Sequence, residues 1–185
     1  KGADFATVTK GGAAGRGLGA TNTNYTRDGD GHGTNTDGEG YLASLHQSHP
    51  TYQFSGGNAV VIGAGGAAKA IVGALVDAGA RKIGVVNRTA ARIESLRQQF
   101  GPAIYPVSPE NYRHVIAACD LLINATSLGM AGQPLLDFDI DNLPVAAIVS
   151  DIVYSPLETP LLKKARLHGN PTIGGLGMLL HQAVR

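Results

Sequence analysis

From Asn58 onward, short apolar runs alternate with stretches of helical period. Five runs rich in Val, Ile, Leu and Ala predict strands at 58–63, 82–86, 103–107, 121–125 and 146–154. Near-continuous apolar strands joined by helices are typical of a parallel sheet that is covered on both faces. The pattern therefore predicts an α/β domain with a doubly wound parallel sheet.

The segments between the first three strands carry the start and stop signals of helices. Residues 67–79 have apolar positions at helical spacing and end at Gly79. Residues 89–101 begin with Thr89, a favoured N-cap, and end at Gly101. These two helices are expected to cover the sheet.

Two later segments use the same signals. Residues 108–119 begin with Ser108 followed by proline, which predicts an N-cap and the first helical position. Residues 159–169 begin with Thr159 and proline and end at Gly169. Both segments are predicted to be helices.

Before Gly56 the chain is dominated by Gly, Thr, Asn and Asp. Residues 21–26 predict a short strand, and 40–47 predict a helix. Between them, residues 28–39 nearly match the spacing of an EF-hand calcium loop. A calcium loop needs a helix on its entering side and oxygen ligands, whereas this flank is Gly-rich and β-branched and His32 is a poor ligand for a hard cation. We therefore expect a hairpin turn here and no metal site.

Composition limits the classes of function. The 185 residues carry a net charge of +1, with no long basic block, so a nucleic-acid surface is not expected. The longest apolar runs are shorter than the ~18 residues of a membrane span, and no signal peptide is expected at the N-terminus. A single cysteine, Cys119, favours a reducing, cytoplasmic setting.

A glycine motif lies at the first predicted strand-to-helix turn. Residues 63–68 read G-x-G-x-x-A. In this motif Gly63 permits the tight turn, Gly65 lets a pyrophosphate approach the backbone, and Ala68 keeps the helix close to the strand. The helix N-terminus then faces the phosphates. The predicted cofactor contacts of this turn are Gly63, Ala64, Gly65, Gly66 and Ala67.

The end of the second predicted strand favours NADP over NAD. An NAD-binding strand usually ends in an acidic residue that binds the ribose hydroxyls, but here the sequence is Asn87-Arg88-Thr89. Arg88 is suited to a bidentate pair with a 2′-phosphate and to stacking on adenine. Arg92, one helical turn later, adds a second cation. A solvated surface role is the alternative for Arg88.

Several motifs in order carry a resemblance to one family. They are NTDGEGYLASL, VIGAGGAAKAI, NRT, LINATSLGM, DIVYSPLETPLL and GGLGMLLHQAV. Together they cover roughly residues 21–184, and the chain resembles shikimate dehydrogenase. The resemblance implies reversible NADP-linked reduction of 3-dehydroshikimate to shikimate, in aromatic amino-acid biosynthesis, by a two-domain enzyme with its site in the cleft.

The resemblance also implies a catalytic pair. Asp37, in NTDG, matches the family's catalytic aspartate, and Lys1 falls at the separation expected for its lysine, ahead of the competing Lys10. A lysine ammonium supplies both a proton and a positive charge for a developing alkoxide, and a carboxylate holds it. Taken alone, Asp37 is also a good N-cap for the helix that follows.

Further site residues follow from the same resemblance. The predicted substrate contacts are Asn22, Asp37, Tyr154 and Gln182. Ile152 and Gly175 are expected to border the cofactor near the nicotinamide. For Tyr154 or Gln182 taken alone, a structural role is an equal alternative.

The expected organisation is the tail of an N-terminal α/β substrate domain at 1–45, an NADP-binding Rossmann-like domain at 46–174, and a C-terminal helix at 175–185 that returns to the substrate domain. The family's upstream half, with a Ser-x-Ser-type pair for the substrate carboxylate, has no counterpart in these residues. The expected partner is a small-molecule substrate. Alternatives are a quinate or amino-shikimate dehydrogenase, and a ligand-binding regulator without activity, against which the Lys–Asp pair argues.

Overall fold

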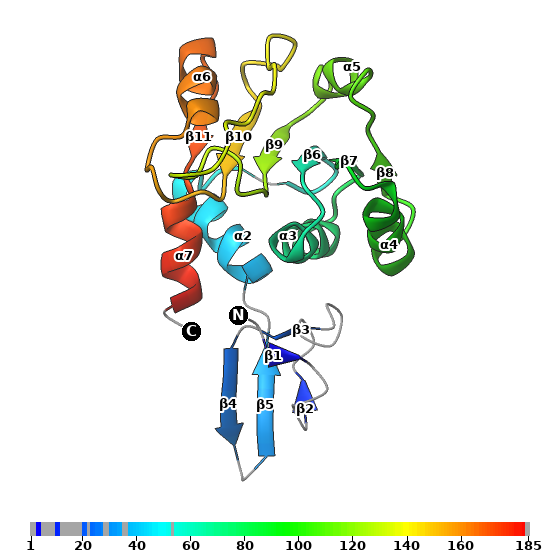
Figure 1. The fold of residues 1–185 in the computed structure, drawn as a ribbon, viewed down its shortest axis with the longest axis vertical. Coiled ribbons are helices and arrows are strands. Elements are labelled where there is room, and N and C mark those ends of the chain that lie inside the picture. The colour runs from blue at the N-terminus through cyan, green and yellow to red at the C-terminus, as the bar shows by residue number, and fades with distance from the viewer. Residues whose placement is uncertain are drawn as a thin grey trace.

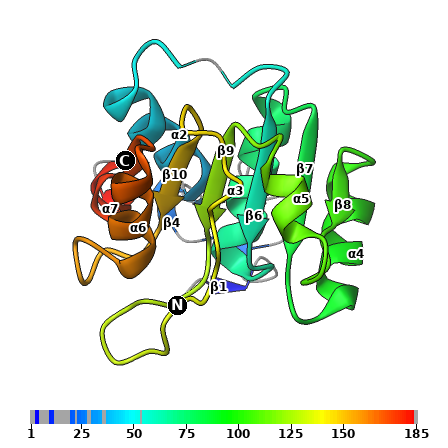
Figure 2. The same ribbon diagram turned by 90° about the horizontal axis from the view of Figure 1, so that it is seen from above.

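The computed structural model describes residues 3–4, 10–11, 20–21, 23–27, 30–34, 37–52 and 54–183, and the side chains of 37–52 and 54–180. Its main sheet has the strand order β11-β10-β9-β6-β7-β8, and every pair is parallel. The strands are β6 (Asn58–Ile62), β7 (Lys82–Val86), β8 (Ile104–Pro106), β9 (Leu121–Asn124), β10 (Ile148–Asp151) and β11 (Thr172–Ile173). Figure 2 shows the strands succeeding one another across the molecule. Numbered along the chain, the order is 3-2-1-4-5-6, the doubly wound arrangement of dinucleotide-binding domains, so the predicted fold class is confirmed.

Helices cover both faces of this sheet (Figure 1). One face carries α2 (Asp37–Ser48), α3 (Gly66–Asp77), α4 (Ala90–Phe100) and α7 (Gly175–Ala183), and the other carries α5 (Tyr112–Ile116) and α6 (Pro160–His168). Side chains along β6 alternate between two buried clusters. Ala59 and Val61 join the cluster under α3, whereas Val60 and Ile62 join the cluster with residues of α5 and α6. Burial on both sides explains why the strands read as continuous apolar runs.

Short strands precede the main sheet. They are β1 (Ala3–Asp4), β2 (Lys10–Gly11), β3 (Ala20–Thr21), β4 (Thr23–Arg27) and β5 (Asp30–Thr34). β4 and β5 pair antiparallel, with Arg27 opposite Asp30. Of the calcium-like segment, Asp30–Thr34 forms β5, and the last residues, from Asp37, belong to α2. No group of three or more potential metal-ligating side chains occurs among the described residues.

The predicted helix caps have different outcomes. Thr159 precedes α6, and its hydroxyl accepts a hydrogen bond from the Leu162 N–H at 3.3 Å, while Gly169 adopts the left-handed conformation after the last turn. Thr89 also precedes its helix, α4, but its side chain makes no capping hydrogen bond. The stop at Gly101 is confirmed, with φ of 96°.

Three element predictions need correction. The helix expected at 108–119 is only α5, five residues long, because turns at 108–111 precede it and its N-cap is Asn111. The strand expected at 146–154 is shorter, since β10 ends at Asp151. The edge strand β11 was not predicted, because two residues between a proline and a glycine carry no periodic signal.

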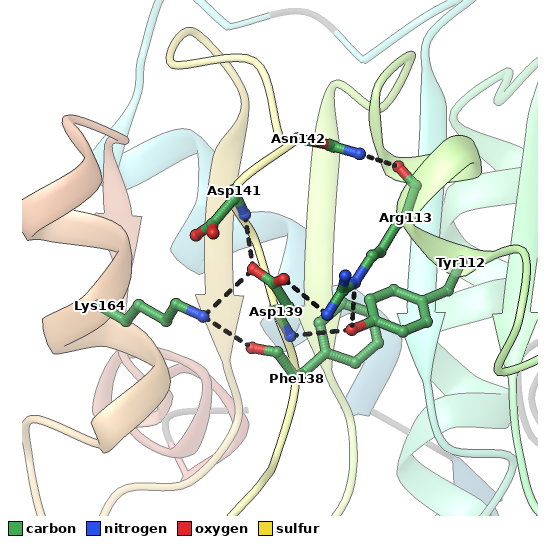
Figure 3. A network of polar contacts seen from close by, with 7 residues as sticks. All are labelled: Tyr112, Arg113, Phe138, Asp139, Asp141, Asn142 and Lys164. Carbon is green, nitrogen blue, oxygen red and sulfur yellow. Dashed lines mark hydrogen bonds and ion pairs between the residues drawn. The ribbon is translucent and has the colours of Figure 1, made fainter.

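A polar cluster fixes the crossover between β9 and β10 on the α5–α6 face (Figure 3). Asp139 lies 2.9 Å from the Arg113 guanidinium and 3.4 Å from the Lys164 ammonium, so it links α5 to α6. The Tyr112 hydroxyl accepts a hydrogen bond from the Asp139 N–H at 3.2 Å, and the Tyr112 ring packs on Phe138 with centroids 4.3 Å apart. The pairs are partly exposed, so their main effect is to fix position.

No helix in the described part of the chain is long and apolar enough to cross a membrane.

Candidate functional site

A cavity of about 480 Å³ opens where the carboxyl ends of β6, β9 and β10 meet. It is lined by Gly63, Ala64, Gly65, Gly66, Ala67, Asn87, Arg92, Ala125, Thr126, Ser127, Met130, Ile152, Val153 and Tyr154. The chain leaves β6 toward one edge of the sheet and β9 toward the other, so this is the switch point of the topology. Ligands of doubly wound sheets bind in this crevice.

The glycine turn has the geometry that the motif requires. Gly63 has φ of 109°, and a Cβ there would lie 2.8 Å from the Thr126 Cγ2 and 3.0 Å from the Ala125 carbonyl oxygen. Only glycine therefore fits between the ends of β6 and β9. At Gly65 and Gly66 an added Cβ would meet nothing within 4 Å, which leaves the space that a phosphate group would fill.

The N-terminus of α3 fits an anion. Its N-cap is Gly65, which has no side chain to satisfy the first-turn N–H groups. In the part of the chain that the structure describes, the N–H groups of Gly66, Ala67 and Ala68 have no hydrogen-bond acceptor. Free N–H groups and the helix dipole favour a pyrophosphate at this position.

Among the residues with described side chains, the cation that borders the cavity is Arg92, on the first turn of α4. It also lines an adjoining cavity of about 370 Å³, together with Lys69 of α3 and Ser95. Asn87 lines the larger cavity, and its side-chain amide donates to the Thr89 carbonyl oxygen at 3.0 Å. Arg88, the residue on which the sequence argument for NADP depended, is exposed and lines neither cavity, and Thr89 does not line them either.

A buried polar network supports the wall formed by β9 and β10. Asn124 and Asp151 are the last residues of neighbouring strands and lie opposite each other. The Asn124 Nδ2 donates to the Asp151 Oδ1 at 3.0 Å and to the Leu128 carbonyl oxygen at 3.1 Å. The Asn124 Oδ1 accepts from the N–H and the hydroxyl of Thr126, at 3.1 and 2.7 Å. Thr126 lines the cavity, so this network shapes its wall.

Asp151 extends the network to α6. Its Oδ1 accepts the Val153 N–H at 3.0 Å, and its Oδ2 accepts the Thr159 hydroxyl at 2.7 Å. Asp151 is only 1% exposed, and this burial raises the pKa of its carboxyl group above the usual value. This network was not predicted from the sequence. The signal available was a polar residue, Asn124 or Asp151, inside each of two apolar runs.

The structure describes only part of the predicted catalytic and substrate set. Asp37 is the first residue of α2 and is partly buried, and Tyr154 is 47% exposed and lines the cavity. Lys1 and Asn22 lie outside the described residues. Of Lys10 in β2 and Gln182 in α7, only the backbone is described.

Two residues predicted to border the cofactor, Ile152 and Gly175, lie at or behind the wall of the cavity. Ile152 lines the cavity. Gly175, the first residue of α7, does not line it but lies directly behind, where its N–H donates to the Val153 carbonyl oxygen at 3.3 Å. A Cβ at Gly175 would lie 2.1 Å from the Ile152 carbonyl oxygen, so the contact requires glycine.

Comparison with known proteins shows the family to which this chain belongs. Residues 44–136, about half of the chain, match the family described as Shikimate / quinate 5-dehydrogenase. The chain belongs to the shikimate/quinate dehydrogenase family. The predicted resemblance is confirmed.

Curated relatives of this shikimate/quinate dehydrogenase family member are close in sequence. A shikimate dehydrogenase (NADP(+)) from Nitrobacter hamburgensis is 46% identical over 170 residues, which are 92% of this chain and 59% of the relative. One from Methylocella silvestris is 48% identical over 179 residues, which are 97% of this chain and 64% of the relative. The chain thus spans about three fifths of the length of these relatives.

Solved structures of the same family have the same fold. Quinate dehydrogenase from Corynebacterium glutamicum in complex with NAD matches with a TM-score of 0.89 and 33% identity, over 97% of this chain and 65% of that one. Shikimate 5-dehydrogenase from Thermus thermophilus in complex with NADP(H) and shikimate matches with a TM-score of 0.82 and 32% identity, over 96% of this chain and 64% of that one.

Proposed function

We propose that this protein is an NADP-linked dehydrogenase that reversibly reduces 3-dehydroshikimate to shikimate. The observation that carries the proposal is the cavity at the switch point of the sheet, where the glycine turn, Arg92 and Tyr154 line one space. The names of the curated relatives support the activity and the cofactor. The role in aromatic amino-acid biosynthesis follows from this reaction.

The chain's own residues fit the proposed cofactor. The glycine turn and the free N–H groups of α3 would hold its pyrophosphate, and the wall at Thr126 and Ile152 would border its nicotinamide end. When bound, NADPH supplies the hydride, and the protein contributes binding and orientation. Arg92 supports the choice of NADP, because a guanidinium at this position would pair with a 2′-phosphate.

The proposed proton transfer depends on Asp37 and a lysine. Reduction of a ketone needs a proton donor and a positive charge near the developing alkoxide, and Lys1 is proposed for both, with Lys10 as the competing residue. Asp37 would hold the ammonium. Asn22, Tyr154 and Gln182 are proposed to bind the substrate.

We retain the predicted division into a substrate-domain tail, a cofactor domain and a returning helix as part of this proposal. α2 crosses the predicted boundary at residues 45 and 46, because Tyr41 and Leu45 are buried in the same cluster as residues of α3. A cytoplasmic location is proposed from Cys119, a free buried thiol.

Quinate is the second candidate substrate, because the quinate dehydrogenase structure matches this chain with a TM-score of 0.89. The test is the initial rate of the full-length protein with shikimate or quinate and with NADP or NAD, followed as absorbance of the reduced cofactor. The highest kcat/KM is expected for shikimate with NADP. A preference for quinate would transfer the proposal to the second candidate, and no turnover with any pair would favour a ligand-binding protein.

A further inference from the structure

Helix α2, which begins at the proposed catalytic Asp37, lies directly against α3. Its second residue is Gly38, which is buried. A Cβ at Gly38 would lie 2.6 Å from the Ala70 carbonyl oxygen and 3.0 Å from the Ala74 Cβ, both on α3. The nearest atom belongs to the backbone and cannot rotate away, so only glycine allows this approach.

A second close contact joins α2 to α7, here against a side chain. A Cβ at Gly177 of α7 would lie 2.3 Å from the Ser44 Oγ and 3.3 Å from the Ser44 Cβ. Ser44 is buried on α2, nearly two turns after Asp37. Helix α2 therefore lies between α3 and α7, and each of these two contacts includes one glycine.

Both neighbours of α2 begin at the wall of the cofactor cavity. α3 follows the glycine turn, which lines the cavity. α7 begins at Gly175, which lies against the backbone of the cavity-lining Ile152. The position of α2 is thus fixed relative to the cavity from two sides, and a shift at either contact would move its first residue.

We infer that Gly38 and Gly177 are positioning residues that hold Asp37 in register with the cofactor cavity. The inference rests on the proposed function, since it assigns Asp37 to the chemistry. Hydride and proton transfer to one carbonyl group require the acid–base residues and the cofactor at fixed separation, and misplacement by about 1 Å costs about 100-fold in rate. The two glycines let the helices approach closely enough to set that separation.

The first test is Gly38→Ala in the full-length protein, with Gly73→Ala as the matched control. Gly73 also lies within a helix, α3, but its added Cβ would meet the Phe100 ring at 2.9 Å, away from α2. We expect Gly38→Ala to lower kcat about tenfold or more. Its Kd for NADPH should stay within about twofold, because α3 and the cavity are unchanged. Gly73→Ala should keep kcat within about twofold, even where its Tm falls.

The second test exchanges the small residue at the α2–α7 contact. Gly177→Ala should lower kcat, because the new methyl group displaces the Ser44 side chain. The double variant Ser44→Gly/Gly177→Ala restores the space and should recover most of kcat. A general loss of folding would not be repaired in this way, since glycine within a helix lowers stability. If Gly38→Ala does not fold, the comparison of Gly177→Ala with the double variant still tests the positioning role.

Failure of this inference differs from failure of the proposed function. If the wild-type protein shows no turnover, the proposed function fails. If it is active and Gly38→Ala keeps its kcat, the glycine does not position Asp37. A parallel loss of kcat and NADPH affinity, or a double variant as slow as Gly177→Ala, would also overturn the inference, because the contacts would then support the fold as a whole.

Discussion

At the scale of single residues, the two arginines after β7 differ in what the sequence motif predicted for them and in where the structure places them. The sequence favoured Arg88, because it occupies the position after the second strand. Both side chains are exposed, but the structure places Arg92 at the border of two adjoining cavities, whereas Arg88 lines neither. The two residues are four positions apart, and the end of β7 alone does not determine which side chain would face a bound cofactor.

Arg92→Ala should weaken NADP binding about 10- to 100-fold, the range for one hydrogen bond to a charged group, and should change NAD binding less than threefold. Calorimetric titration with both cofactors measures this. Arg97→Ala is the control, because Arg97 lies on the same helix, pairs with Glu94 at 3.7 Å and lines neither cavity. If Arg88→Ala alone removes the preference for NADP, the 2′-phosphate lies outside both cavities.

Asp151→Asn should change how stability depends on pH. Burial raises the pKa of Asp151 in the folded protein above its unfolded value, which is about 3.9. The folded state then binds the proton more tightly, so ionisation lowers the free energy of unfolding as pH rises from about 4 through the folded pKa. Urea unfolding of both proteins from pH 4 to 8 should therefore show wild-type stability falling relative to the variant. Parallel curves would mean that burial does not shift this group.

At the scale of secondary-structure elements, Thr159 and Thr89 occupy the same position before α6 and α4 but differ in what they contact. Thr159 is buried and links the Leu162 N–H to the Asp151 carboxylate. Thr89 is exposed and makes no capping bond. The sequence predicted both helix starts from residue type alone.

Thr159→Ala should lower the free energy of unfolding by about 2–3 kcal/mol, because it removes a cap and leaves a buried carboxylate oxygen without its donor. Thr89→Ala should change it by less than about 0.5 kcal/mol. Urea titration of both variants measures the difference. Equal losses at the two positions would show that the Asp151 contact contributes nothing beyond the cap.

The elements that sequence predicted well are those with long periodic signals, such as β7, which has the predicted bounds. Predictions failed where side-chain contacts determine the end of an element. β10 ends early because the Asp151 side chain accepts the Val153 N–H and turns the chain. The Asn124–Asp151 pair could not be predicted, since the two residues are 27 positions apart and meet only through parallel pairing of β9 and β10.

At the scale of the whole molecule, the candidate site combines segments from both halves of the sheet. The glycine turn was predictable, because a strand, the motif and a helix adjoin in sequence. The wall at Thr126 and Val153 was not, because it depends on the strand order. Asp37 joins this arrangement through α2, which packs on both α3 and α7. In the proposed function, cofactor binding and proton transfer thus depend on different parts of the chain.

We propose that Asp37 takes part in the chemistry while the cavity binds the cofactor. The most direct measurement pairs the kcat for shikimate oxidation with the Kd for NADPH in Asp37→Asn of the full-length protein, with Lys1→Ala and Lys10→Ala beside it. We predict that Asp37→Asn and Lys1→Ala each lower kcat about 100-fold or more, with NADPH affinity within about twofold of wild type and Lys10→Ala near wild type. Unchanged kcat in Asp37→Asn, or NADPH affinity lost together with activity, would contradict the account.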